Sequence, residues 1–220
     1  SKSALEGAAA PPIRLIAIGP AKTKVEIGNE TVMFRHDESF YHAPGVGVLV
    51  SDKLSASELT AKVTAIAKLR FVRVGTELHA HCVAVLNDSG AAGPFEKAVA
   101  ALKQTGLPLI LMSAEAAHVE KALALCAADR PLIHAATEAN WEAFAKLSKA
   151  NNCPLAVVAP DLDRLAALTE KVRGAGVEDI VLDLTAGTTP DTLQALTASR
   201  RLALKRQARD WGAHEYLSKG

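Results

Sequence analysis

The stretch Thr31–Asp52, TVMFRHDESFYHAPGVGVLVSD, contains the segment that decides the fold. Its second half, Gly45–Asp52, is an apolar run of strand length that ends in an acidic residue, and a helical pattern follows at once. Such a run, bounded by turn residues, is typical of a buried strand. The first half, Phe34–His42, is rich in charged and aromatic side chains, and we expect it to close the bottom of the structure that this strand begins.

The same pattern of an apolar run followed by an amphipathic stretch repeats along the rest of the chain. Apolar residues recur at helical spacing within each amphipathic stretch, as at Val119, Leu123 and Cys126. The predicted strands are Val46–Val50, Cys82–Leu86, Leu109–Met112, Leu132–Ala135, Leu155–Val158 and Ile180–Leu184. The predicted helices are Ser57–Leu69, Pro94–Gln104, Ala116–Ala127, Asn140–Ala150, Leu162–Gly174 and Thr189–Arg209.

The apolar character of both faces of each strand indicates parallel strands that are covered by helices. Two features favour a closed barrel over an open doubly wound sheet. The spacing from helix to strand is regular, and no glycine-rich phosphate loop follows the first strand. The sequence therefore predicts an α/β fold of the (β/α) TIM-barrel type, of which about six of the eight strand–helix units are visible.

A small β-hairpin is expected in front of the barrel, formed by Lys24–Ile27 and Thr31–Phe34, because Gly28-Asn29 is a turn signal. The chain accordingly divides into three parts. Residues 1–10 are predicted to be a linker, residues 11–44 to hold the hairpin and the segment that leads into the barrel, and residues 45–220 to form the incomplete barrel.

Composition excludes several classes of function. With 25 basic and 24 acidic residues, the net charge of +1 gives no reason to expect binding to nucleic acid or to an anionic membrane. No apolar run approaches the roughly 20 residues that a membrane span requires. The cysteines Cys82, Cys126 and Cys153 are far apart, which fits a reducing compartment and argues against a disulfide framework. We therefore expect a cytoplasmic protein.

Polar residues follow the predicted strands, at the end where ligands bind in a parallel barrel. Those that we expect to line a cleft are Asp52, Asn87, Asp88, Thr137 and Asp183, and Ser113 and Asp161 occupy similar positions. Carboxylate and amide groups placed in this way can hold a pterin ring or another polar heterocycle. The alternative is that these residues cap the helices that follow, as Asp, Asn, Ser and Thr commonly do.

A pair of histidines, His79 and His81, has the His-x-His spacing with which several metal-dependent hydrolases begin their site. The pair precedes the strand Cys82–Leu86, however, and therefore lies at the end of the barrel opposite to the usual active site. A partly exposed pair of loop histidines is the favoured interpretation, and no metal site is expected. No nucleophile accompanies a base elsewhere, so no catalytic residue is assigned.

Several segments together resemble one known family, the large subunit of the corrinoid iron–sulfur protein, which is the gamma subunit of acetyl-CoA decarbonylase/synthase. The resemblance covers the chain from about Pro11 onward, is most specific in FRHDESFYH, and corresponds to the central barrel domain of that subunit. The segments that carry it are Pro11–Gly19, Glu30–His42, Ser89–Leu102, Leu107–Ser113, Ala136–Leu147, Asn152–Lys171 and Gly176–Leu184.

The resemblance implies a methyl-carrying protein of the reductive acetyl-CoA (Wood–Ljungdahl) pathway. In that family the barrel lies between a domain with a four-iron four-sulfur cluster and a domain that binds the corrinoid (cobalamin). The subunit forms a heterodimer with a small subunit. Its cobalt accepts a methyl group from methyl-tetrahydropterin through a methyltransferase and delivers it to acetyl-CoA synthase, so both enzymes are implied as transient partners.

This chain lacks the closely spaced cysteines of the cluster domain, so no cofactor ligand of the family can be assigned to it. We therefore expect a scaffold barrel that binds no cofactor and performs no catalysis of its own. Two alternatives stay open. One is a pterin-dependent methyltransferase with its own site at Asn87, Asp88 and Asp183, and the other is a metal hydrolase that uses His79 and His81.

Overall fold

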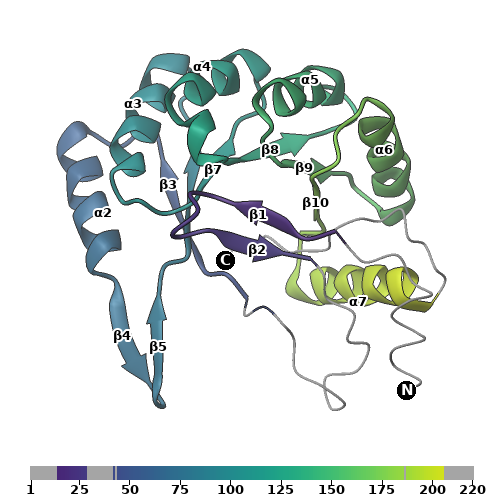
Figure 1. Ribbon diagram of the computed structural model, residues 1–220, viewed down its shortest axis with the longest axis horizontal. Helices are drawn as coiled ribbons and strands as arrows, with labels where there is room; N and C mark the ends of the chain where they lie inside the picture. The colour runs from purple at the N-terminus through teal and green to yellow at the C-terminus, as the bar shows by residue number, and fades with distance from the viewer. Residues whose placement is uncertain (1–13, 29–41, 43, 186, 206–220) are drawn as a thin grey trace.

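The computed structural model describes residues 14–28, 42, 44–185 and 187–205 (Figure 1). Its centre is a six-stranded sheet of the order β10-β9-β8-β7-β6-β3, in which every neighbouring pair is parallel. The strands are β3 (Gly47–Ser51), β6 (Cys82–Leu86), β7 (Leu109–Met112), β8 (Leu132–Ala136), β9 (Leu155–Val158) and β10 (Ile180–Asp183). The six predicted strands are thereby confirmed, and they lie side by side in chain order.

The six predicted helices are confirmed as well, and five of them cover one face of the sheet. They are α2 (Ala56–Lys68), α3 (Ala92–Lys103), α4 (Ala116–Cys126), α5 (Trp141–Asn151), α6 (Leu162–Gly174) and α7 (Thr189–Lys205), with the short 3₁₀ turn η1 (Ala127–Asp129) after α4. Figure 1 shows α2 to α6 in an arc along the outer side of the sheet. Right-handed crossovers between strands in sequential order place each helix on the same face, whereas a doubly wound sheet reverses direction and places helices on both.

The strand order is that of a barrel wall, but the described strands do not close it. Among them, β3 pairs only with β6, and β10 pairs only with β9. The structure therefore shows a parallel sheet flanked by helices, in which β3 and β10 are the edge strands of the described part.

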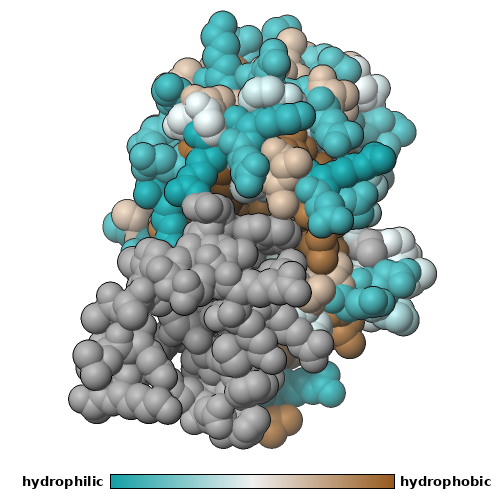
Figure 2. All heavy atoms as spheres, turned by 90° about the vertical axis from the view of Figure 1, so that its right-hand side faces the viewer, coloured by the Kyte–Doolittle hydropathy of each residue, from teal (hydrophilic) through white to brown (hydrophobic). Residues whose placement is uncertain are grey.

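Apolar residues are buried on both faces of the sheet, as the sequence predicts for parallel strands. On the outer face, strand residues such as Val83 and Leu111 pack against helix residues such as Phe95 and Phe144, all of them fully buried. On the concave face a second cluster joins Ile110 and other strand residues to the N-terminal hairpin. Figure 2 shows that the exposed surface of the helical layer is mainly hydrophilic.

A hairpin in front of the sheet is present, and its described pairing joins β2 (Val25–Ile27) to an earlier strand. Strand β2 pairs antiparallel with β1 (Ile16–Ile18), and Ile16 lies opposite Ile27. The predicted partner strand Thr31–Phe34 lies outside the described residues. The Ile-Ala-Ile alternation of β1 explains the pairing, because it places both isoleucines in the concave cluster.

Gly19, directly after β1, lets the hairpin approach the N-terminal ends of the sheet strands. Its φ is +94°, and a Cβ at this position would lie 2.4 Å from Cγ of Pro108, the residue before β7. The Gly19 N–H donates to the carbonyl of Arg130 at 2.9 Å, and Thr23 Oγ1 donates to the carbonyl of Gly106 at 2.6 Å. Only glycine combines this backbone conformation with this contact.

A second hairpin, between α2 and β6, was not predicted. Strands β4 (Arg70–Arg73) and β5 (Thr76–His79) pair antiparallel and are joined by Val74-Gly75. The prediction of a loop around His79 was therefore wrong. The alternation in these strands is weak because no residue of β4 is buried, and valine before glycine is not a usual turn signal.

Helix α2 begins at Ala56, one residue earlier than the predicted start at Ser57. Its N-cap is Ser55, whose Oγ accepts from the Glu58 N–H while Glu58 accepts from the Ser55 N–H at 2.8 Å. This reciprocal capping box sets the start of the helix.

Candidate functional site

The polar residues that follow the strands lie at the C-terminal edge of the sheet, where parallel α/β proteins bind ligands. Two of them connect neighbouring loops. Asp52, which is buried, accepts hydrogen bonds from the N–H of Ser89 at 2.8 Å and from its Oγ at 2.6 Å. Asp88 is exposed and accepts from Ser51 Oγ at 3.1 Å. Both carboxylates thus join the loop after β3 to the loop after β6.

Thr137 and Asp161 lie at helix starts. Asp161 is the N-cap of α6 and accepts from the Arg164 N–H at 2.8 Å. The Thr137 carbonyl accepts from the N–H of Trp141, the first residue of α5, at 3.0 Å. Their side chains organise the turns from strand to helix, which is the common role of these residue types.

Asn87 connects the end of β6 to β7 and α4. Its Nδ2 donates to Ser113 Oγ at 3.0 Å and lies 2.7 Å from Nδ1 of His118. This cluster holds three neighbouring elements together. Because Nδ2 of Asn87 already contacts both partners, it has no hydrogen left to donate to a ligand.

Asp183 differs from the other predicted residues because it lies on the concave face. Strand register places one layer of side chains along the C-terminal edge of this face, where Leu86 aligns with Met112, Met112 with His134, and Val158 with Asp183. In this layer His134 Nε2 lies 2.8 Å from Asp183 Oδ2. The two side chains are 9% and 4% exposed and form a polar pair among apolar neighbours.

The pair spans two strand spacings, because β9 lies between β8 and β10. Neighbouring strands are about 4.8 Å apart, so alternate strands lie roughly 10 Å apart in a flat sheet. The 2.8 Å contact therefore requires both side chains to lean toward each other across β9 on the concave side.

Two opposing effects act on the ionisation of Asp183. Burial raises the pKa of its carboxyl, but hydrogen bonds from His134 and from Thr185, whose N–H lies 2.9 Å from Oδ1, outweigh burial and lower that pKa. The group is therefore a carboxylate at neutral pH. A carboxylate can only accept, so we assign the hydrogen of this bond to His134 Nε2.

An imidazole that is oriented by a buried carboxylate can accept an N–H or O–H from a ligand or take up a proton. Both oxygens of Asp183 already accept hydrogen bonds, so Nδ1 of His134 is the atom of the pair that is left to bind a ligand. Sequence reasoning missed His134 because it lies within an apolar run. The available signal was its alternation with Leu132, which places both residues on one face, together with an acidic residue at the end of a nearby strand.

Within the described ranges, no group of three His, Cys, Asp or Glu residues is placed to hold a metal ion. The rings of His79 and His81 lie 4.5 Å apart, and His81 Nδ1 accepts the N–H of Val46 at 3.0 Å, which occupies the lone pair that a metal would need. Desolvation, with His79 nearby, lowers the pKa of His81. His81 therefore joins the base of the second hairpin to the segment before β3.

The cysteines are buried thiols. Burial raises the pKa of Cys82 and of Cys153 to about 11 and that of Cys126 to about 12. They are protonated at neutral pH, which disfavours them as nucleophiles or metal ligands.

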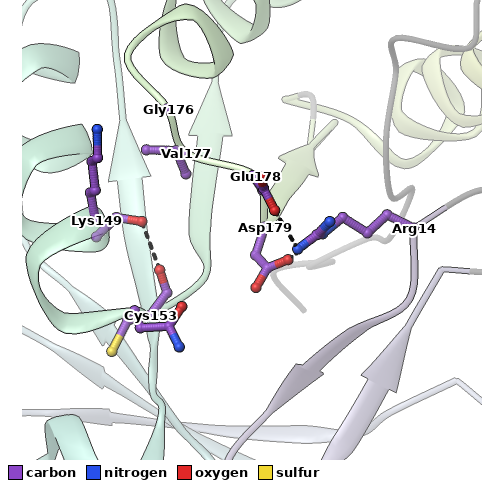
Figure 3. Close-up of a pocket in the computed structure, with 9 residues that line it drawn as sticks. Arg14, Lys149, Cys153, Gly176, Val177, Glu178 and Asp179 are labelled. Atoms are coloured by element: carbon purple, nitrogen blue, oxygen red, sulfur yellow. Dashed lines mark hydrogen bonds and ion pairs between the residues drawn. The ribbon is translucent and has the colours of Figure 1, made fainter.

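A cavity of about 140 Å³ lies at the opposite end of the sheet, before β9 and β10 (Figure 3). Arg14, ahead of β1, pairs with Asp179 at 2.5 Å and with Glu178 at 2.9 Å, and Arg130 also pairs with Asp179. The hydrogen bond to Asp179 raises the pKa of Arg14. These ion pairs neutralise the acidic charges that line the cavity. We therefore infer that they attach the segment before the N-terminal hairpin to the sheet, and that the cavity is not a ligand site.

No helix in the described part of the chain is long and apolar enough to cross a bilayer. The sequence matches the family model described as CO dehydrogenase/acetyl-CoA synthase delta subunit over residues 15–212. It is 43% identical over 213 residues to the corrinoid/iron-sulfur protein large subunit of Moorella thermoacetica, an alignment of 96% of this chain and 48% of the relative.

Archaeal proteins named acetyl-CoA decarbonylase/synthase complex subunit gamma are also similar. Identity is 31% for that of Methanothermobacter thermautotrophicus and 34% for that of Archaeoglobus fulgidus, with 91% and 79% of this chain covered, respectively, and 45% and 37% of the relatives. The chain thus spans about half, or less, of the length of the curated relatives that it matches. By the extent of the family match, the chain belongs to the CO dehydrogenase/acetyl-CoA synthase delta subunit family.

Proposed function

We propose that this chain is the scaffold of a corrinoid iron–sulfur methyl carrier, which passes a methyl group from methyl-tetrahydropterin to acetyl-CoA synthase in the reductive acetyl-CoA pathway. The observation that carries the proposal is the 43% identity, along almost the whole chain, to a protein named as the large subunit of such a carrier. The expected partners are a small subunit, in a heterodimer, and the methyltransferase and acetyl-CoA synthase as transient contacts, in the cytoplasm.

The residues present do not fit an iron–sulfur cluster. A four-iron cluster is held by four cysteine thiolates, and this sequence has three cysteines, all buried with raised pKa values. No redox or cobalt step is therefore assigned to residues of this chain. In the proposal the cluster and the corrinoid belong to flanking domains, and this chain keeps those domains and the small subunit in position.

The rigidity that a scaffold needs is provided by burial on both faces of the sheet. We infer that the sheet is the larger part of a TIM-type barrel, because its strands are in sequential parallel order and its helices lie outside. In this proposal residues 1–10 are a linker, residues 11–44 hold the N-terminal hairpin, and residues 45–220 supply the barrel.

A second function, a pterin-dependent methyltransferase with its own site, has one supporting observation. The His134–Asp183 pair lies among apolar side chains at the C-terminal edge, which is the composition of a small-molecule site. Asn87 and Asp88, the other residues expected for this function, are engaged by neighbouring loops and by α4. The site would therefore depend on the pair alone.

Two measurements decide between these functions. Size-exclusion chromatography with light scattering, on the chain mixed with the purified small subunit, should give a one-to-one heterodimer if the scaffold proposal holds, and two separate species would refute it. Isothermal titration calorimetry with 5-methyltetrahydrofolate should give no heat in the scaffold case. Micromolar binding that is weakened in Asp183→Ala would instead establish the methyltransferase.

A further inference from the structure

The hairpin of β4 and β5 is a two-stranded sheet that stands apart from the rest of the fold. We call residues 70–79 the arm. Four register pairs hold it together, and no third strand in the described part of the chain pairs with either edge. Figure 1 shows the arm projecting away from the sheet and the helices. A two-stranded hairpin without a third strand is only marginally stable in water. A hairpin that projects in this way therefore adds little to the stability of the fold, which suggests a role in binding.

The base of the arm is well held. It starts two residues after the end of α2, and Ala80, directly after β5, is 3% exposed. His81 accepts the Val46 N–H at 3.0 Å, which fixes the return of the chain into β6. The arm is therefore attached at both ends to rigid elements and projects in a defined direction.

The arm carries apolar side chains that contact little of the chain. Phe71 is 52% exposed, Val72 72% and Val74 98%. Phe71 and Val72 point to opposite faces, since successive strand residues alternate. In Figure 2 apolar atoms are visible at the lowest end of the molecule, where Figure 1 places the tip of the arm. Apolar exposure that is concentrated on one projecting segment, on both of its faces and at its tip, indicates an interaction surface.

The turn at the tip is a second, independent observation. Val74 and Gly75 have φ values of +50° and +77°. A two-residue turn with both φ values positive is most stable with asparagine before glycine, and a β-branched residue is strained there. Val74 thus weakens the turn and makes almost no contact within the chain, so local stability does not explain a valine at this position.

We propose that the arm inserts Phe71, Val72 and Val74 into an apolar pocket of a partner protein that is rimmed by carboxylates. The acidic rim follows from charge. Arg70 pairs with Glu77 at 2.9 Å, whereas Lys68 and Arg73 have no ion-pair partner among the described residues. An exposed aromatic residue beside arginine is the composition of an interface centre. The inference rests on the proposed function, which makes the small subunit the partner.

The test compares Val74→Asn with the parent chain in two assays. Because asparagine suits the turn, the variant should melt about 2–4 °C higher than the parent by circular dichroism. Because the tip loses its apolar side chain, its Kd for the purified small subunit should rise at least about tenfold in surface plasmon resonance. Phe71→Ser should weaken binding as well. The matched control is Leu193→Asn on α7, which removes another exposed apolar side chain, 64% exposed, and should leave the Kd unchanged.

Each result has one meaning. A parent chain that binds the small subunit, with the same Kd in Val74→Asn and Phe71→Ser, overturns the arm inference and leaves the proposed heterodimer intact. A parent chain that does not bind the small subunit overturns the heterodimer itself. A dimer of the chain alone that dissociates in Val74→Asn would show that a second copy occupies the arm, and the inference about the small subunit would be wrong.

Discussion

The buried pair of His134 and Asp183 leads to a quantitative prediction for Asp183→Asn. The substitution preserves the shape of the side chain and removes its charge. A hydrogen bond to a charged group contributes about 1.5–3 kcal/mol, and a neutral one about half of that. Because the 2.8 Å contact is almost fully buried, solvent does not screen it. The carboxylate accepts two hydrogen bonds, from His134 and from the Thr185 N–H, and each should weaken by about 1 kcal/mol. We therefore expect the free energy of unfolding to fall by about 2 kcal/mol and the melting temperature by about 4–8 °C.

The pH dependence of this loss follows from the lowered pKa of Asp183. Hydrogen bonds from His134 and Thr185 hold that pKa below the ordinary value of 3.8 despite burial. The carboxylate therefore stabilises the fold fully above pH 3.8, and this contribution is lost as pH falls through the folded-state pKa. The difference in the free energy of unfolding between the parent chain and Asp183→Asn should be constant from pH 7 to pH 5 and should decrease below pH 4.

Urea denaturation followed by circular dichroism at pH 7, 5 and 3 measures both effects. The matched control is Asp161→Asn, the same chemical change at an exposed N-cap, which should cost less than about 0.5 kcal/mol because asparagine caps helices as well as aspartate does. The reasoning about the pair is refuted if Asp183→Asn is as stable as the control variant at pH 7. It is also refuted if the stability difference between the parent chain and Asp183→Asn is the same at pH 5 and at pH 3.

Three further predictions test the packing. Phe144→Ala empties a fully buried position between α5 and the sheet and should cost about 3–5 kcal/mol in urea denaturation, whereas a loss below 1 kcal/mol would contradict the assigned core. Gly19→Ala forces a Cβ against Pro108 at a positive φ. It should cost about 1–3 kcal/mol and expose the N-terminal hairpin to limited proteolysis, and unchanged proteolysis would show that the hairpin does not need this approach. The three cysteines, with pKa values raised to about 11 or 12, should stay unlabelled by iodoacetamide at pH 8 until urea is added, and rapid labelling of the native chain would disprove their burial.

The strands and helices of the main sheet could be predicted from sequence because continuous apolar runs mark the strands and apolar residues at helical spacing mark the helices. Apolar runs such as Leu109–Met112 are buried throughout, and no polar position competes with that assignment. The arm was missed for the opposite reason, because β4 buries nothing and a strand without a buried face has no alternation to detect. The pairing of β2 with β1 was not predicted, because a turn signal shows where the chain reverses and does not show which earlier strand is nearby.

The candidate site was predicted in part. The rule that ligands bind at the C-terminal edge of a parallel sheet brought Asp183 into consideration. Its partner His134 depends on the positions of two strands that are separated by β9, and the sequence shows that relation only once strand order is known. Asp52 and Asp161 satisfied the same rule, but Asp52 bonds to Ser89 of a neighbouring loop and Asp161 caps its own helix through Arg164.

Native mass spectrometry tests the central claim, that this chain supports cofactor domains without holding a cofactor itself, most directly. The chain and the purified small subunit are mixed, incubated anaerobically with hydroxocobalamin, iron and sulfide, and desalted before measurement. The account predicts one dominant species, with the summed mass of one chain and one small subunit and no added cobalt or iron. A stoichiometric corrinoid or cluster on the 220-residue chain, or the failure of the two proteins to associate, would contradict it.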